Sequence, residues 1–261
     1  MKITLFTSNS NRHNYFINLL SNYCDQLYVV QESKTFFKSN NVSKQTEKNI
    51  IEKYFIKVLE AESQVFKKEF AINNKNINTL SIINNEINNL PLTYFNDYLK
   101  SDFYIVFGSS YIKGDLVNFL INHKAINIHA GVSPFYRGTD CNFWALYDEN
   151  PHLVGSTIHL LSKGLDSGPI LYHAMSNLKT DPFEYSMSSV KSAFHSIAEK
   201  IKDRSIFKIT PSFQDKNNEL RYSKKNEFTE DVVKEYFEKD INLYAKEFDK
   251  SFLKEPFFLN K

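Results

Sequence analysis

Residues 127–138 read NIHAGVSPFYRG, and they overlap the mostly apolar segment KAINIHA at 124–130. Alternate residues of a β-strand share one face, so Asn127 and His129 should point side by side at the end of a buried strand. Burying such polar groups costs free energy unless they are hydrogen-bonded. The two side chains therefore either satisfy each other or face a cleft.

The segments before this stretch predict an α/β fold. A β-rich run, a helical stretch and a second β-rich run open the chain, and a second βαβ unit ends in the quoted residues. Such units predict a mostly parallel sheet. The expected elements are strands at 2–8, 26–33, 102–108 and 125–131, helices at 15–24 and 110–122, and a long amphipathic helix over 46–70. The Asn-rich stretch 82–91 has the composition of a loop.

The pattern changes after residue 138. Two β-like segments surround a glycine-bounded loop at 162–168, and a helix follows from Pro182 with Asp181 as its N-cap. The tail, 205–261, is an irregular stretch with some β character, closed by a helix from Thr229. A soft boundary near residue 203 divides the chain into an α/β domain, 1–203, and a small C-terminal extension, 204–261.

Composition and charge exclude several classes of protein. The chain has 261 residues, of which 42% are hydrophobic, which is typical of a globular protein and not of a disordered one. A net charge of +2 and a pI near 8.3 fall short of the basic character of a nucleic-acid binder. The two cysteines have no paired spacing, and the sequence contains no signal peptide and no apolar run that could span a membrane. We expect a cytoplasmic protein without a metal site.

Asp166 supports a functional role for Asn127 and His129, because it adds a carboxylate in the loop SKGLDSGPI, between two glycines. A histidine can take a proton, a carboxylate can orient it and an amide can stabilise an oxyanion, which together suit acyl transfer. The chain has no GxSxG, GxGxxG or phosphate-binding loop motif, so the nucleophile would belong to the substrate. The alternative is that the strand residues cap strand ends and Asp166 forms a turn.

The pair INIHAGVSPFYRG and GLDSGPIL resembles the formyltransferase family that uses 10-formyltetrahydrofolate. The resemblance covers roughly residues 1–200 and implies a Rossmann-like fold. Matched to the family signature, Asn127, His129 and Asp166 are its catalytic residues. One departure is GVSP, where most members have Ser-Leu-Leu-Pro.

The segment VFGSSYIK is similar to the strand end with which the family holds the pterin of its folate cosubstrate. The resemblance therefore implies Ser110, Tyr111 and Ile112 as folate-binding residues, through their backbone. An ordinary turn between a strand and a helix is the alternative for these three.

The resemblance leaves the acceptor amine to be chosen. The tail is too short for the RNA-binding domain of the methionyl-tRNA branch, and TSNSNRHN lacks the phosphate-gripping glycines of the purine branch. What remains is similar to the sugar N-formyltransferases, which act on nucleotide-linked amino-deoxysugars for lipopolysaccharide, other surface polysaccharide or flagellin glycans. The alternatives are formylation of methionyl-tRNA or glycinamide ribonucleotide, and a catalytically inactive folate- or nucleotide-sugar-binding homologue.

The tail segment LRYSKKNEFT resembles the short hairpin that holds the nucleotide in the sugar branch. Tyr222 would stack on the base, and Lys224 or Lys225 would neutralise the diphosphate. A solvated basic turn is the alternative. Arg137 is a further candidate, either for substrate binding or for anchoring a loop through an internal carboxylate.

The expected partners follow from this choice of branch. They are folate and a nucleotide-linked amino sugar, with no nucleic acid and no membrane, and the protein is expected to be a homodimer. The C-terminal extension is expected to hold a hairpin and a helix.

Overall fold

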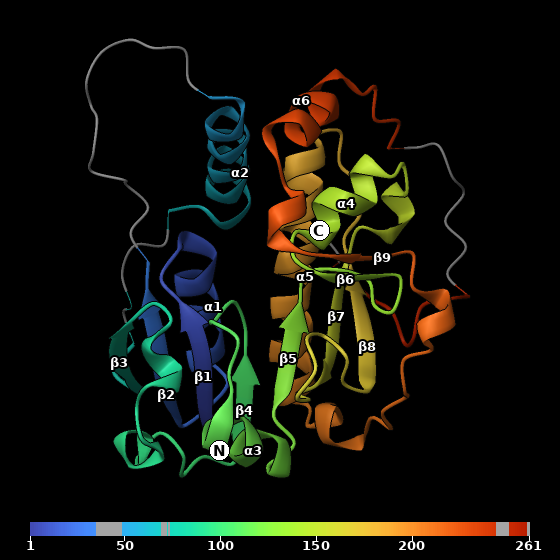
Figure 1. The fold of residues 1–261 in the computed structure, drawn as a ribbon. Coiled ribbons are helices and arrows are strands. Elements are labelled where there is room, and N and C mark those ends of the chain that lie inside the picture. The colour runs from blue at the N-terminus through green and yellow to red at the C-terminus, as the bar shows by residue number, and fades with distance from the viewer. Residues whose placement is uncertain (35–48, 69–71, 73, 244–250, 260–261) are drawn as a thin grey trace, which may run out of the picture.

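The computed structural model describes residues 1–34, 49–68, 72, 74–243 and 251–259. Within these residues the chain forms a mostly parallel eight-stranded sheet with helices on both faces, and a separate two-stranded sheet (Figure 1). The strands are β1 (Lys2–Ser8), β2 (Gln26–Ser33), β3 (Ile77–Ile83), β4 (Phe103–Val106), β5 (Ile126–His129), β6 (Tyr136–Gly138), β7 (Ser156–Leu160), β8 (Ile170–Met175), β9 (Arg221–Ser223) and β10 (Phe257–Phe258). The helices are α1 (Asn11–Ser21), α2 (Ile50–Phe66), α3 (Gly114–Asn122), α4 (Cys141–Tyr147), α5 (Pro182–Lys202) and α6 (Glu230–Glu238).

The large sheet has the strand order β10-β8-β7-β5-β4-β1-β2-β3. Strands β3, β2, β1, β4 and β5 run parallel, and β7 then pairs antiparallel with β5. The chain winds outward from β1 in one direction through β2 and in the other through β4. Ligands of open α/β sheets bind at such a switch point, outside the carboxyl ends of the strands.

Apolar side chains fix the two helical layers. The first core cluster joins one face of the sheet to residues of α1, the end of α2 and α5, among them Phe16, Phe66 and Phe194. The second face packs against α3 through Val117 and Leu120. Strands covered on both faces become continuous apolar runs, which is why β4, FYIV, could be predicted from the sequence.

The α/β fold with a mostly parallel sheet is confirmed, and several elements differ in extent. The long helix expected over 46–70 spans Ile50–Phe66. The helix expected at 110–122 begins only at Gly114, which has a positive φ of 64° where the preceding loop ends. The expectation for the Asn-rich stretch holds only in part, because its first two residues end β3 (Ile77–Ile83), an edge strand that the sequence did not reveal.

The expected hairpin in the C-terminal extension is wrong. β9 pairs in parallel with β6, far away in the sequence, and β10 pairs in parallel with β8 of the large sheet. Long-range contacts hold β9 in this place, because Arg221 of β9 forms two hydrogen bonds with the Asp148 carboxylate. The helix from Thr229 is present as α6, with Thr229 as its N-cap. The division of the chain at residue 203 stays a prediction.

No helix among the described residues is long and apolar enough to cross a membrane.

Candidate active site

A cavity of about 490 Å³ opens at the carboxyl ends of β4 and β5. Asn127, His129 and Asp166 all line it, whereas Ile126 lies in the apolar core and Ile128 belongs to that core and also reaches the cavity. The strand period therefore places Asn127 and His129 on the cavity side, as the alternation predicts.

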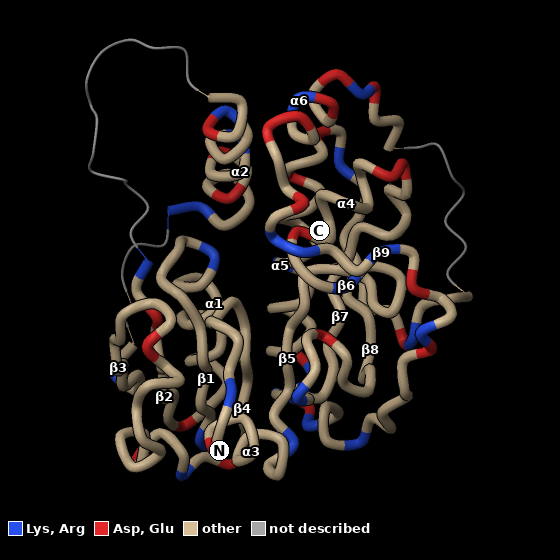
Figure 2. The backbone as a smooth tube through the Cα atoms, viewed as in Figure 1, with Lys and Arg blue, Asp and Glu red and all other residues tan. Residues whose placement is uncertain are grey.

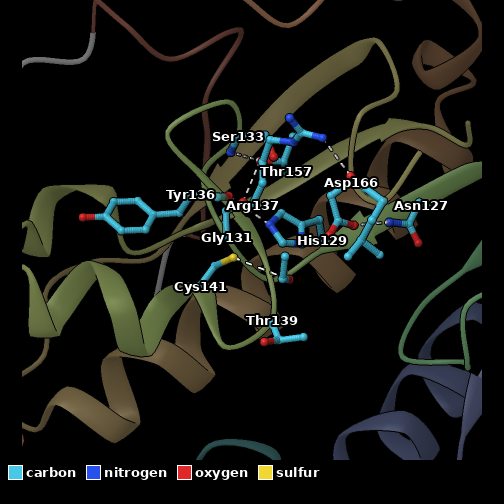
Figure 3. Close-up of polar contacts among 12 residues, drawn as sticks. Asn127, His129, Gly131, Ser133, Tyr136, Arg137, Thr139, Cys141, Thr157 and Asp166 are labelled. Carbon is cyan, nitrogen blue, oxygen red and sulfur yellow. Dashed lines mark hydrogen bonds and ion pairs between the residues drawn. The ribbon is translucent and has the colours of Figure 1, made fainter. Parts of the chain in front are cut away.

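Asp166 joins the two strand residues. Its Oδ2 lies 3.4 Å from Nδ1 of His129, and its Oδ1 lies 3.4 Å from Nδ2 of Asn127. Figure 3 shows the carboxylate between the imidazole and the amide. The imidazole and the carboxylate are largely removed from water, since the side chains of His129 and Asp166 are only 6% and 9% exposed. The fold thus brings together two sequence motifs that lie far apart along the chain.

The hydrogen bonds of His129 decide which of its nitrogens can exchange a proton. Nε2 lies 3.1 Å from the Tyr136 carbonyl oxygen, which can only accept, so Nε2 carries a hydrogen. Nδ1 therefore faces Asp166 and the cavity. Burial lowers the pKa of His129 below its ordinary value, although the Asp166 carboxylate acts against this. The imidazole is thus neutral at neutral pH, as a general base must be.

Asp166 is held as a carboxylate. Burial acts to raise its pKa, but the nearby rings of His129 and His159 and the Gly138 amide together bring the pKa below its ordinary value. A stable negative charge beside Nδ1 favours the protonated imidazole. The pair can therefore accept a proton from an amine and stabilise it.

His159 belongs to this cluster, and sequence reasoning missed it. Its Nδ1 donates to the Leu160 carbonyl, so its Nε2 accepts the hydrogen bond from Nδ2 of Asn127 at 3.0 Å. His159 sits directly opposite Asn127 in the antiparallel pair of β5 and β7. Only the strand register reveals this neighbour.

Ser110, Tyr111 and Ile112 also line the cavity. The Ser110 amide donates to the carboxylate of the buried Glu32, at the end of β2, and the Tyr111 hydroxyl donates to the Lys163 carbonyl. Ile112 is buried in the core. Glu32 was not a candidate in the sequence, and it fixes the shape of this turn. The folate-binding role of the three residues stays a prediction.

The structure does not bring Arg137, Tyr222 and Lys224 into the wall that the described residues form around the cavity. Arg137 donates to the Leu165 carbonyl at 2.9 Å and to Glu219 at 2.8 Å, so it ties the Asp166 loop to an internal carboxylate. Tyr222 is 41% exposed, with its ring 5.5 Å from the Arg137 guanidinium. The Lys224 amide donates to Glu227 in a capping box.

Among the described residues, no group of three or more His, Cys, Asp or Glu side chains could hold a metal ion. The chemistry available at the cavity is that of a neutral imidazole, a carboxylate and an amide. An amide donor beside a base in one cavity suits attack on a carbonyl carbon, where negative charge develops on oxygen.

The comparisons with known proteins agree with this geometry. Residues 96–205 match the family described as formyl transferase. A 4-N formyltransferase from Francisella tularensis has 18% sequence identity and a TM-score of 0.54, over 87% of this chain and 77% of that chain. Glycinamide ribonucleotide transformylase 1 from Symbiobacterium toebii has 13% identity and a TM-score of 0.51, over 82% and 94%.

A third similar structure is an N-formyltransferase from Helicobacter canadensis in complex with folinic acid and dTDP-3-aminofucose. It has 14% identity and a TM-score of 0.50, over 90% of this chain and 79% of that chain. At such identities the structures share the fold. The family match adds the sequence evidence, because its range contains Asn127, His129 and Asp166. The part of the chain that carries these three residues, 96–205, is thus similar in sequence to the formyl transferase family.

Proposed function

We propose that this protein transfers the formyl group of 10-formyltetrahydrofolate to the amine of a nucleotide-linked amino-deoxysugar. The observation that carries the proposal is the cluster of Asn127, His129 and Asp166 at the mouth of the cavity. The complete cluster also argues against a homologue that has lost catalysis.

In the proposed reaction the neutral sugar amine attacks the formyl carbon, and a new C–N bond forms. The negative charge that develops on the formyl oxygen is stabilised by Nδ2 of Asn127, which exchanges its long hydrogen bond to Asp166, 3.4 Å in the structure, for one to this oxygen. Such a donor contributes about 3–4 kcal/mol to transition-state stabilisation. Nδ1 of His129 takes the proton that the amine loses, and Asp166 stabilises the imidazolium. The bond from the formyl carbon to N10 of the folate then breaks, and His129 returns the proton to that nitrogen. Atoms and charge balance without a metal.

The first helix supplies an argument against glycinamide ribonucleotide as the acceptor. The carboxylate of Glu62, 2% exposed, accepts from the Arg12 backbone amide at 2.7 Å and from the Arg12 guanidinium at 2.9 Å. An acid of the chain thus already occupies the N-terminus of α1, where a phosphate would otherwise find free amides. The first loop also lacks glycines.

Basic residues on another part of the rim support a diphosphate-bearing acceptor. Arg12 and Lys34 line the cavity. Burial lowers the pKa of Lys34, Glu32 raises it, and the positive charges of Arg12 and Lys225 lower it further. Arg12 and Lys225 are therefore each close enough to repel the Lys34 ammonium. Figure 2 shows Lys and Arg on the segment that leads into α6 and on the N-terminal half that faces it.

The experiment that tests the proposed function supplies 10-formyltetrahydrofolate with a panel of amino-sugar nucleotides, glycinamide ribonucleotide and methionyl-tRNA. We expect mass spectrometry to detect a formylated sugar nucleotide and an equal amount of tetrahydrofolate. The His129→Ala variant is the control for uncatalysed transfer. Formylation of glycinamide ribonucleotide or methionyl-tRNA alone would contradict the choice of acceptor.

The roles of the tail residues are tested with the same assay. Lys225→Ala should raise KM for the sugar nucleotide and leave kcat nearly unchanged, because a diphosphate contact is made equally in ground and transition states. Tyr222→Ala and Lys224→Ala should do the same if Tyr222 stacks on the base and Lys224 meets the diphosphate. Unchanged KM in all three variants would contradict a nucleotide site in the extension. A role in surface polysaccharide or flagellin glycan synthesis, a homodimer and a cytoplasmic location stay predictions.

A further inference from the structure

The loop that carries Asp166 adopts a backbone conformation that must be held in place. Asp166 has φ 47°, in the left-handed region that is uncommon for residues other than glycine. Such a conformation persists only where the surrounding structure fixes it. The position of the carboxylate beside His129 therefore depends on what binds this loop.

Gln214, in the C-terminal extension, binds the loop from one side. Its Nε2 donates to the carbonyl of Asp166 and to the carbonyl of Gly168, both at 2.8 Å. Both partners can only accept a hydrogen bond, so the orientation of the amide is fixed. The contact restrains the backbone of the residue whose carboxylate faces His129.

The segment before Gln214 is itself anchored to the large sheet. Ser212 and Ile170 exchange two backbone hydrogen bonds, of 2.9 and 2.7 Å, at the start of β8. On the other side of the loop, Arg137 donates to the Leu165 carbonyl. Gln214 is thus a rigidly placed donor and not a loosely held surface side chain.

We propose that Gln214 is a positioning residue, which holds the Asp166 carboxylate in register with His129 and Asn127. It does not touch the reacting atoms, and its role rests on the formyl transfer proposed above. When the two hydrogen bonds are lost, the Asp166 backbone is free to leave its left-handed conformation. The carboxylate then spends less time at 3.4 Å from Nδ1.

The test uses two variants and a matched control. Gln214→Ala removes both hydrogen bonds, and Gln214→Glu keeps the shape but offers only acceptors to the two carbonyls. The control is Gln26→Ala, which removes a similar bond from a glutamine Nε2 to the Asn76 carbonyl at the start of β2. Circular dichroism and thermal unfolding identify any variant that fails to fold.

We expect kcat to fall about tenfold in both Gln214 variants, which corresponds to the net effect of one or two hydrogen bonds. KM for the folate and for the acceptor should change little. Gln26→Ala should keep the kcat of the parent enzyme. A fall in kcat equal to that of Gln26→Ala, or a rise in KM with unchanged kcat, would overturn the proposal.

A second measurement does not depend on turnover. Three titratable side chains shift the pKa of His129. Asp166 raises it, whereas His159 and Arg137 lower it. NMR titration of His129 should therefore give a lower pKa in both Gln214 variants than in the parent enzyme. An unchanged pKa would overturn the positioning role. If no acceptor is formylated by the parent enzyme, the proposed function fails, and this titration still decides the role of Gln214.

Discussion

Nδ1 of His129 is the atom on which the proposed chemistry depends. Its partner nitrogen is bound to the Tyr136 carbonyl, and the Asp166 carboxylate lies 3.4 Å away. Burial makes the imidazole a weaker base than an exposed histidine, and the carboxylate partly restores its basicity. The balance between these two effects sets the pH range of activity.

The first prediction concerns that pH range. A base works only when it is deprotonated, so a lowered pKa extends activity toward acid. We expect the acid limb of the kcat/KM profile to lie below pH 6.5, the ordinary value for histidine. In Asp166→Asn the limb should move further toward acid, because the attraction that raises the His129 pKa is lost, while the maximal rate falls. Initial rates between about pH 5 and 8 measure both changes. A limb that stays in place in Asp166→Asn would contradict the pairing.

The sequence predicted some of these residues and not others for a physical reason. Asn127 and His129 are separated by one residue in a strand, so local geometry alone places them together. His159 and Gln214 reach the cluster through strand register and through the path of the extension. Those long-range pairings depend on the packed fold, and no local pattern encodes them.

Among the elements, the small sheet of β6 and β9 connects the extension to the site. Its pairing requires glycine at 138, which has φ 96° and lies so close to β9 that a Cβ would be 2.0 Å from the Ser223 carbonyl oxygen. The Gly138 amide also bonds the Asp166 carboxylate. The turn thus serves both the sheet and the catalytic cluster.

The second prediction compares two glycines with positive φ. Gly114→Ala should cost about 1–2 kcal/mol in the free energy of unfolding, because φ is 64° and a Cβ would meet nothing within 4 Å. Gly138→Ala should cost about 2 kcal/mol more, because β9 must move away from β6. Urea unfolding of the two variants measures the difference. Equal stability of the two variants would show that the close approach to Ser223 is not maintained.

The burial and the pairing of the strands explain which of them could be predicted from the sequence. β4, FYIV, is buried on both faces and therefore appears as a continuous apolar run, and β1, KITLFTS, is rich in β-forming residues and almost fully buried. β3 lies at the edge of the sheet with half of its residues exposed, so its pattern is weak. β9 has only three residues, and its pairing with β6 could not be predicted because the two strands lie far apart in the sequence.

At the scale of the whole molecule, the extension is built into the domain that it follows. β10 joins the large sheet beside β8, and the Lys254 backbone amide donates to Nδ1 of His173. Nε2 of His173 in turn lies 2.8 Å from the Ser133 carbonyl, in the turn that follows β5. A neutral His173 thus connects the end of the chain to the turn beside the site.

The third prediction follows from the charge state of His173. Burial lowers its pKa to about 4, so the unfolded chain binds a proton between pH 6.5 and 4 that the folded chain does not. The free energy of unfolding should therefore fall as the pH falls through this window, with His173 alone contributing about 3 kcal/mol. Urea unfolding at several pH values should show a smaller fall in His173→Gln than in the parent. An identical pH dependence in His173→Gln would contradict the assignment.

The most direct test of the account measures tetrahydrofolate release by the parent enzyme, Asn127→Ala, His129→Ala and the double variant. Because the base and the oxyanion donor act in one transition state, each single variant should lose about 10²–10⁴-fold in kcat. The double variant should lose far less than the product of the two. Folate binding should persist in all of them. Near-parental kcat in either single variant would contradict the central claim that this cluster performs the transfer.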